Sequence, residues 1–474
     1  MRQISLKFLS AAMSLAVLLG GASEADASTG TVSGTLWFYN KNGSFCPTNA
    51  SCTGATYKQS SYNTYIALPE VTVQIIRAAN GAVIGTGSTN SAGNYQITWN
   101  SAADPGNLSA KLRVVWKHKT GRFEFHTLGN TPHLPVPGFD ITLPLTAGTT
   151  VGAPQIKNWN IGSAAMPEKM SNLHWAAWRM FGKMLESTRM LQNLVNVDIL
   201  AFEAPSNGPV TTSVTCAKSS CAYIARFSDA PERPAWAEKR LTLVLDGFGS
   251  TPYTPMKIMH ELGHLADFSA GPGTASFHGV RRETGYDYLG SSSWSMTSTE
   301  YAPTALTEGF ASFLAMSAFY DGSGTVAYHC MGNGVVANQE HCYPPDSAWG
   351  SMAIAMEAKA TCSSPKGRHP YNVMRYFWDI YDTHVDGTDA SDLTLTNILE
   401  SLAYWPCSPF PGCYGPNQLH DQFHNISNSL LTTTVNPNAL DENGAWDYMN
   451  NMLNNYPPAY NVSGAYTQNC MGNL

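Results

Sequence analysis

The stretch Thr254–Phe268, which reads TPMKIMHELGHLADF, holds the most informative pattern in this sequence of 474 residues. It begins with a threonine that can cap a helix and a proline that suits the first helical position, so the stretch predicts a helix. Residues four apart on a helix share one face, and His260 and His264 are therefore placed to bind one metal ion together. Glu261, beside the first histidine, can then reach a water molecule on that metal.

Two histidines do not complete a catalytic zinc site, which needs a third protein ligand and keeps its fourth position for water. The best candidate is Glu308, a single carboxylate in the apolar stretch Thr304–Ala315 (TALTEGFASFLA), which is a second predicted helix. A carboxylate among Ala, Leu and Phe is costly to bury unless it is paired or bound to a metal. The sequence therefore predicts a Zn²⁺ site with His260, His264 and Glu308 as the metal ligands.

Other acidic residues compete for the third ligand position. Glu283, Asp287 and Glu300 also follow the motif, and Asp287 would make an aspartate-type site. The metzincin group of zinc peptidases needs Gly at position 267 and His or Asp at position 270; Asp267 and Ala270 stand there instead, which excludes that group. Asp267 follows the histidines on their face of the helix, so it is either an acceptor for an imidazole N–H or an exposed acid.

The H-E-x-x-H motif, followed on a later helix by Thr-Glu-Gly-Phe-Ala, resembles the gluzincin group of zinc metallopeptidases. The resemblance implies that His260, His264 and Glu308 bind Zn²⁺ and that Glu261 is the catalytic general base. The sequence departs from the thermolysin type at Ser312, where that type has an aspartate four residues after the glutamate ligand. The interval between the motif and Glu308 is also longer than in the best-known members.

The same resemblance implies a tyrosine or histidine further along the chain that donates a hydrogen bond to the oxyanion. Tyr371 and Tyr376 are the candidates, although each is also explained as an aromatic residue that packs on its helix. A second histidine pair with the four-residue spacing, His420 and His424, lacks a glutamate after the first histidine. We interpret that pair as part of a solvent-exposed face.

The N-terminal part has a different pattern, in which short alternating segments are separated by turns. The predicted strands are 71–75, 83–85, 89–97, 112–116 and 122–125, with a turn at Ala79-Asn80-Gly81. From Leu68 the order Leu-Pro-x-Val-x-Val and then Thr-x-Ser-x-Gly-x-Tyr resembles the prealbumin-like, carboxypeptidase-regulatory-type modules of secreted enzymes, between Gly30 and Leu143. This resemblance implies an all-β sandwich with an accessory role over residues 28–150.

Beyond a joint rich in Gly, Pro and Thr near 146–156, longer periodic segments begin. The predicted helices include 166–192, 303–320, 348–361 and 371–383, and the predicted strands are 196–202, 222–227 and 241–245. The predicted fold class is therefore multidomain: the N-terminal all-β sandwich is followed by an α+β, zincin-like metallopeptidase domain, residues 157–474, with a mainly helical C-terminal part.

Residues 1–27 are predicted to be a signal peptide, with a basic start, the apolar stretch Phe8–Leu19 and a cleavable Ala25-Asp26-Ala27. This predicts a secreted protein, extracellular or periplasmic, without membrane insertion. Ten cysteines follow, and an even number in an oxidising compartment indicates disulfides. Pairing near neighbours gives the hypothesis Cys46–Cys52, Cys216–Cys221, Cys330–Cys342, Cys407–Cys413 and Cys362–Cys470.

Charged residues make up 13% of the chain, against about 25% in ordinary soluble domains. The net charge is −7 and no run of Lys or Arg exists, so nucleic acids and anionic membranes are poor partners. A composition with 43% hydrophobic residues and little charge also excludes charge-driven disorder and a coiled coil.

Together these patterns predict a secreted zinc-dependent metalloendopeptidase, in which Glu261 assists the attack of a zinc-bound water on protein or peptide substrates. One alternative is an exported binding or adhesin-like protein whose zinc site is structural or inactive. Another is an aminopeptidase, although the segment Asp246–Ser250 lacks the usual motif that anchors the substrate amine. The sequence predicts no oligomeric state.

Overall fold

The structure is a computed structural model that describes a subset of the chain. The described residues are 28–40, 64–101, 108–126, 135–145, 155–161, 165–184, 197–203, 222–224, 240–245, 259–260, 262–264, 302–319, 328–329, 354–355, 369–382 and 393–403. The predicted signal peptide and all ten cysteines, with their predicted pairing, lie outside these residues.

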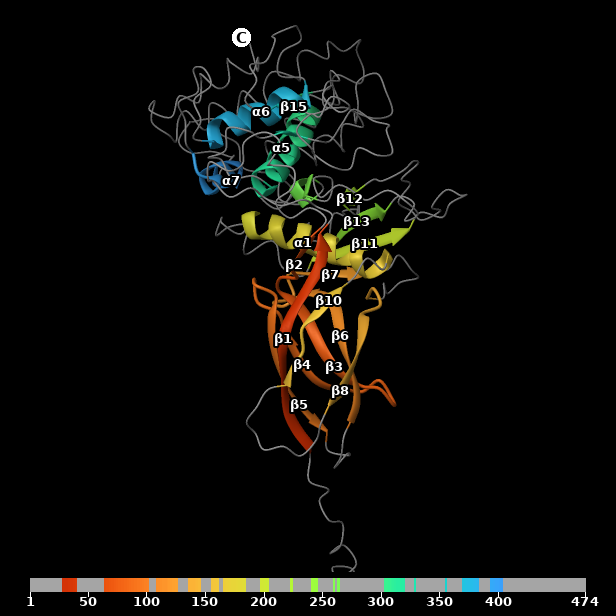
Figure 1. Ribbon diagram of the computed structural model, residues 1–474. Helices are drawn as coiled ribbons and strands as arrows, with labels where there is room; N and C mark the ends of the chain where they lie inside the picture. The colour runs from red at the N-terminus through yellow and green to blue at the C-terminus, as the bar shows by residue number, and fades with distance from the viewer. Residues whose placement is uncertain are drawn as a thin grey trace, which may run out of the picture.

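The first sheet is built around the long strand β1 (Ser28–Asn40), drawn in red in Figure 1. It pairs antiparallel with β2 (Thr64–Ala67) and β5 (Asn94–Ser101), and parallel with β9 (Gln155–Ile156) and β10 (Trp159–Ile161). The long strand has partners on both of its edges: residues 32–33 pair with β5 and with β9, and residues 37–38 pair with β2 and with β10.

The second sheet holds eight strands and extends from the N-terminal part into later segments of the chain. Its members are β3 (Val71–Arg77), β4 (Val83–Ser88), β6 (Leu108–His118), β7 (Phe123–His126), β8 (Phe139–Leu145), β11 (Val197–Glu203), β12 (Ala222–Ile224) and β13 (Arg240–Leu245). β7 and β11 pair in parallel, with Val197 opposite Phe123, and β11 pairs in parallel with β13. The sheet is therefore continuous between segments that are far apart in sequence.

The two sheets share an apolar core because their strands alternate buried and exposed residues. In β5 the buried positions include Tyr95, Ile97 and Trp99, and alternation of the same kind runs along β6. β4 of the second sheet lies close over β5 of the first: a Cβ atom added at Gly87 would lie 2.8 Å from Cγ1 of Ile97. The glycine is thus required by close packing between the sheets.

The observed elements cover most of the predicted ones. β3 to β7 contain or overlap the predicted N-terminal strands, and Gly81 has the positive φ (72°) of a turn residue. The sheets also cross the predicted joint near 146–156, since β9 and β10 pair with β1 and β11 pairs with β7. The division into two domains therefore stays a prediction.

The predicted helix 348–361 is wrong at the residues that the structure describes. Ile354–Ala355 form β15, which pairs antiparallel with β14 (Tyr328–His329). The Ala- and Met-rich sequence favours a helix, but a tertiary pairing with a distant segment overrides this weak local preference. Ile354, a β-branched residue opposite His329, suits such a pairing.

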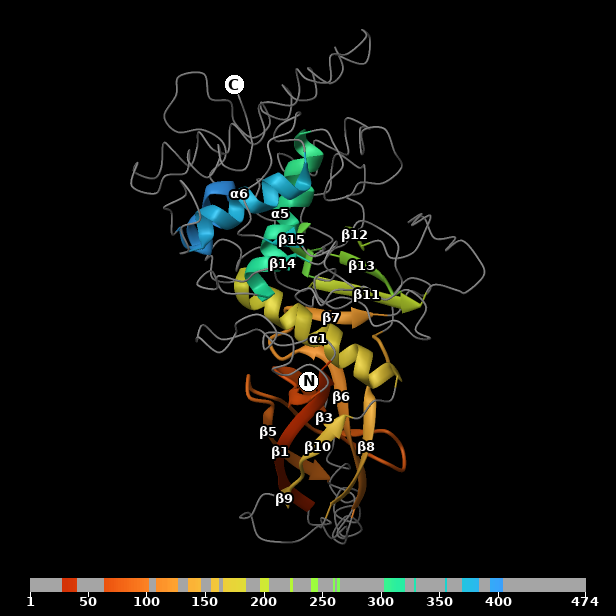
Figure 2. The same ribbon diagram turned by 45° about the horizontal axis from the view of Figure 1, so that its top comes forward.

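Helix α1 (Ala165–Met184) lies across one end of the β-rich part, between it and the helices above (Figures 1 and 2). Asn172 donates a hydrogen bond to the carbonyl oxygen of Tyr39 in β1, at 3.0 Å. Further along the helix, Arg179 Nε donates a hydrogen bond to the carbonyl oxygen of Ala318, in the helix of residues 302–319, at 2.9 Å. The helix therefore connects the first sheet with the helical part of the molecule.

Three further helices are described beyond residue 300: α5 (Ala302–Phe319), α6 (Pro370–Tyr381) and α7 (Leu395–Ala403). α5 and α6 pack through aromatic rings, with Phe377 at 4.9 Å from Phe310 and 5.4 Å from Phe313, measured between ring centroids. α6 starts at a proline, which suits the first turn, and ends where the Asp382 N–H bonds to the Trp378 carbonyl. No described helix has the length and apolar character needed to cross a membrane.

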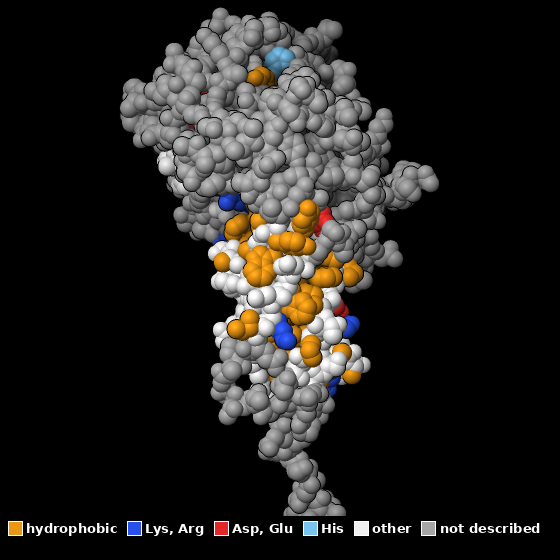
Figure 3. Space-filling view, viewed as in Figure 1, with side chains coloured by type: hydrophobic (Ala, Val, Ile, Leu, Met, Phe, Trp, Pro, Cys, Tyr) orange, Lys and Arg blue, Asp and Glu red, His pale blue; other side chains and the backbone are white. Residues whose placement is uncertain are grey.

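The low charge of the sequence is visible on the surface of the β-rich part. In Figure 3 the described surface of this part is mostly orange (hydrophobic) and white (other side chains and backbone), with few Lys, Arg, Asp or Glu side chains. Tyr65, Val83 and Ile156 are the large hydrophobic side chains exposed among the described residues. Ion pairs described in this part include that of Arg113 with Asp140, in which two hydrogen bonds join β6 and β8.

A buried histidine fixes α1 on the β-rich part. His174 is fully buried, its Nε2–H donates to the carbonyl oxygen of Pro69 at 2.9 Å, and its ring lies 5.1 Å from that of Phe123. The ring of Phe123 also lies 5.2 Å from that of His118, whose Nε2 is 3.0 Å from the Glu70 carboxylate. Burial lowers the pKa of His174 to about 3, although the bond to the Pro69 carbonyl opposes the shift.

Stability should therefore fall with acid through His174. A histidine of the unfolded chain titrates near 6.5, so between pH 6.5 and 3 the unfolded chain binds the extra proton. The free energy of unfolding then decreases by about 1.4 kcal/mol for each pH unit, as an order of magnitude. Denaturant unfolding at pH 7, 6 and 5 gives the free energy of unfolding at each pH, and this free energy should change less with pH in His174→Gln than in the unmodified protein. Burial also lowers the pKa of His118, although the contact with Glu70 opposes the shift. His118 is present in the unmodified protein and in His174→Gln, so its effect on the pH dependence cancels in the comparison. Equal slopes would contradict the prediction.

Candidate metal centre

The predicted metal ligands come from two helical segments. His260 and His264 lie in the helical residues 259–260 and 262–264, and Glu308 lies in α5. The histidine rings stand 4.6 Å apart between centroids, nearly perpendicular at 83°. This is the arrangement expected of residues four apart on one helix face.

The three side chains converge on one point. Nε2 of His260 and Nε2 of His264 each lie 3.1 Å from Oε2 of Glu308. His260 is 1% exposed, His264 6% and Glu308 2%, so the contacts are made inside the protein. Among the described residues, these three form the one group of His, Cys, Asp or Glu side chains whose ligand atoms could share an ion, all within 4.8 Å of one another.

Close helix packing brings these side chains together. A Cβ atom added at Gly263 would lie 2.8 Å from both Cα and the carbonyl oxygen of Ala311 in α5. A Cβ atom added at Gly309 would lie 2.5 Å from Cβ of Val373 in α6. Gly263, beside His264, thus allows its helical segment to approach α5, and Gly309, beside Glu308, allows α6 to approach α5.

The donor set suits zinc. Two imidazoles and one carboxylate are ligands of catalytic zinc sites. Ligand atoms bound at about 2.0–2.2 Å to a tetrahedral zinc ion stand about 3.3–3.6 Å from one another. The two observed separations of 3.1 Å are within a few tenths of an ångström of that range, so a small outward movement of the side chains would admit the ion.

Ser312 contacts the first histidine from the other side. Its Oγ lies 2.9 Å from Nδ1 of His260, and the serine is fully buried. Glu308 and Ser312 are four residues apart, so one face of α5 presents both side chains to His260. Sequence reasoning noted Ser312 as a departure from a family pattern and missed this contact, which the four-residue spacing from Glu308 could have indicated.

Several residues named from the sequence lie outside the described residues. One of them is Glu261, the proposed general base. The others are the second histidine pair, His420 and His424, and four acids near the motif, Asp267, Glu283, Asp287 and Glu300. The structure thus brings together His260, His264 and Glu308, and the roles of the other residues stay predictions.

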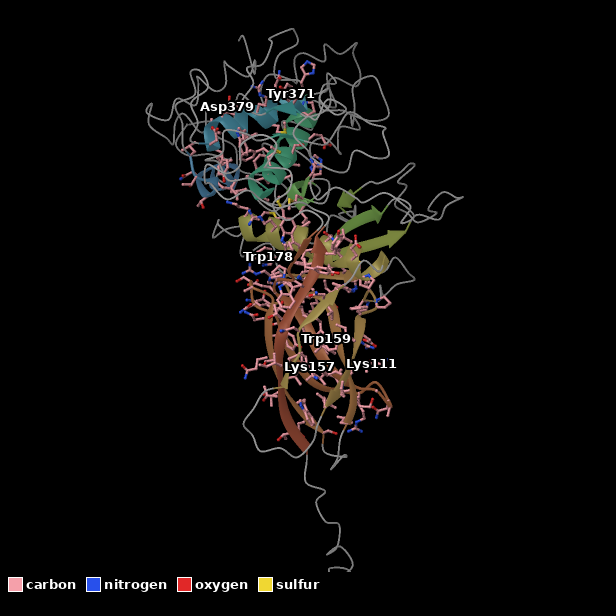
Figure 4. All side chains as sticks on the ribbon, viewed as in Figure 1. Lys111, Lys157, Trp159, Trp178, Tyr371 and Asp379 are labelled. Atoms are coloured by element: carbon pink, nitrogen blue, oxygen red, sulfur yellow. The ribbon has the colours of Figure 1, made fainter. Side chains whose placement is uncertain are left out.

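The two tyrosines proposed as oxyanion donors both lie on α6. Tyr371 is partly buried near the start of the helix, and its hydroxyl accepts a hydrogen bond from Arg375 Nη1 at 3.3 Å (Figure 4). Tyr376 is fully buried, with its ring 5.2 Å from that of Phe377. Pro370 and Val373, which contact Gly309, place the first turn of α6 beside the residue that follows Glu308. The oxyanion role of either tyrosine stays a prediction.

Comparisons with known proteins do not assign the chain to a family. No protein-family model matches it, and no curated protein matches it. Among solved structures, one similar chain is a crystal structure of a 9R-lipoxygenase from Cyanothece PCC8801, with 12% identity. The match covers 35% of this chain and 24% of that chain, with a TM-score of 0.14. Similarity at this level carries no argument about fold or function.

The close approach at Gly263 can be tested with a methyl group. Gly263→Ala should force the helical segment around Gly263 away from α5. This overpacking should lower the free energy of unfolding by about 1–3 kcal/mol. Gly182→Ala is the matched control, because a Cβ atom in that part of α1 meets nothing within 4 Å. It should be neutral or stabilising by up to about 1 kcal/mol. Denaturant unfolding measures both, and equal effects would refute the packing role.

Removing the carboxylate should remove the metal. Glu308→Ala is expected to lose stoichiometric Zn²⁺ after dialysis, measured by atomic absorption, because two histidines alone do not hold catalytic zinc. Glu70→Ala is the matched control, since Glu70 also contacts a histidine, His118, at 3.0 Å but lies in the β-rich part. Full zinc content in Glu308→Ala would instead identify Asp287 or another acid as the third ligand.

Proposed function

We propose that this chain is a secreted zinc-dependent metalloendopeptidase, with an N-terminal β-sandwich module followed by a zincin-like catalytic domain. The observation that carries the proposal is the convergence of His260 Nε2 and His264 Nε2 on one oxygen of Glu308 in a buried site. Buried polar groups gathered in this way need a function or a partner that offsets the cost of their desolvation.

The ligand set favours a catalytic zinc over a structural one. Structural zinc sites are built mainly from cysteine, with or without histidine, whereas two histidines and one glutamate form a catalytic ligand set that keeps a position for water or substrate. The described residues supply two histidines and one glutamate. When bound there, zinc supplies Lewis acidity, which lowers the pKa of water and polarises the scissile carbonyl group.

The protein groups then have separate roles. His260, His264 and Glu308 hold the ion, and Glu261 accepts the proton of the attacking water and passes it to the leaving amine. The role of Glu261 rests on its place in the H-E-x-x-H motif, directly after His260. Export rests on the predicted leader at residues 1–27, and protein or peptide substrates follow from the reaction.

A single set of digests tests this function. The mature protein is incubated with a peptide library derived from a proteome, with and without a zinc chelator, and the products are read by mass spectrometry. We expect chelator-sensitive cleavage inside peptides. Removal of residues from N-termini would indicate an aminopeptidase, and bound zinc without cleavage would favour the exported binding protein.

The general base is tested in the same assay. Glu261→Gln should retain zinc and lose at least about 100-fold in turnover, because proton transfer by a positioned group contributes roughly 10²–10⁴-fold. Glu124→Gln is the matched control: this glutamate pairs with Lys117 in the β-rich part and should leave turnover unchanged. Unchanged turnover in Glu261→Gln would refute the proposed mechanism.

A further inference from the structure

Ser312 is a buried polar residue that none of the proposed reaction steps uses. Its Oγ lies 2.9 Å from Nδ1 of His260, while Nε2 of the same ring lies 3.1 Å from Oε2 of Glu308. Both nitrogens of the imidazole are therefore contacted by oxygen atoms that come from a single helix, α5. The serine is fully buried, with an exposed fraction of 0%.

The proton position on His260 decides which nitrogen of the ring can bind a metal. A ring nitrogen binds a metal through a lone pair, so Nε2 can serve as ligand when the proton is on Nδ1. Nδ1–H then needs an acceptor, and Ser312 Oγ lies at hydrogen-bond distance. We propose that Ser312 is a positioning residue, which holds the ring orientation that metal binding through Nε2 requires and accepts the Nδ1 proton of that state. The inference rests on the proposed zinc site.

A hydroxyl at this position can serve both states of the ring. Without a metal, Nε2–H can donate to Glu308 Oε2, and Nδ1 can then accept the hydroxyl proton of Ser312. With a metal, Nδ1–H donates and the hydroxyl oxygen accepts. The same two atoms bond in either case, so His260 changes tautomer without rotating its ring.

The helix packing supports this role. Ala311, the chain neighbour of Ser312, is the residue against which Gly263 packs. The contact between the two backbones therefore lies beside the bond between Ser312 and His260. A metal-binding histidine donates its other ring N–H to a hydrogen-bond partner, and removing such a partner weakens metal binding by about 10- to 100-fold.

The test measures metal affinity of the full mature chain. Zn²⁺ dissociation constants are obtained by competition with a chromophoric chelator, and Co²⁺ absorption spectra report ligand geometry. Ser312→Ala is expected to bind Zn²⁺ about 10- to 100-fold more weakly. Ser317→Ala is the matched control: it lies on the same helix, is equally buried, and its hydroxyl donates to the Leu314 carbonyl. Its affinity and spectrum should equal those of the unmodified protein.

A second pair of variants keeps the test decisive if Ser312→Ala does not fold. Ser312→Thr and Ser312→Val have the same shape and differ by the hydroxyl, so Thr should bind zinc more tightly than Val. Equal affinities within this pair, or between Ser312→Ala and Ser317→Ala, would overturn the positioning role. Absence of zinc binding in the unmodified protein would instead refute the proposed function itself, so the two failures are distinguishable.

Discussion

One buried carboxylate oxygen, Oε2 of Glu308, is the atom on which the described site depends. Two histidine nitrogens lie 3.1 Å from it, and all three residues are buried. A buried carboxylate is costly unless it is paired or bound to a metal. The helical segment that carries His260 and His264 must therefore approach α5 closely enough for both histidines to reach it, and Gly263 provides the space.

The framework around this oxygen extends into the β-rich part. α5, which carries Glu308, receives a hydrogen bond from Arg179 of α1, and α1 is in turn fixed to the first sheet and to Pro69 by Asn172 and His174. A chain of hydrogen bonds and packed helices thus connects the strands with the site. Groups held by several rigid elements keep their geometry better than groups on loops.

The site residues differ in how far sequence reasoning could identify them. His260 and His264 follow from helix periodicity, and Glu308 follows from the rarity of a lone carboxylate in an apolar helix. The four-residue spacing places Ser312 on the same helix face as Glu308, but its contact with His260 also depends on how the two helices face each other. The wrong helix at 354–355 has the same cause, since a pairing with residues 328–329 outweighed local preference.

By itself, the sequence determined the alternating strands, the helical spacing of the two histidines and the choice of a small set of acids for the third ligand. These features depend on local periodicity and on the cost of burying charge, both of which act within a few turns of chain. Tertiary structure alone decided that Glu308 meets both histidines, that Ser312 stands behind His260, and that β7 continues into β11. Such contacts join residues distant in sequence, so they depend on how the whole chain packs.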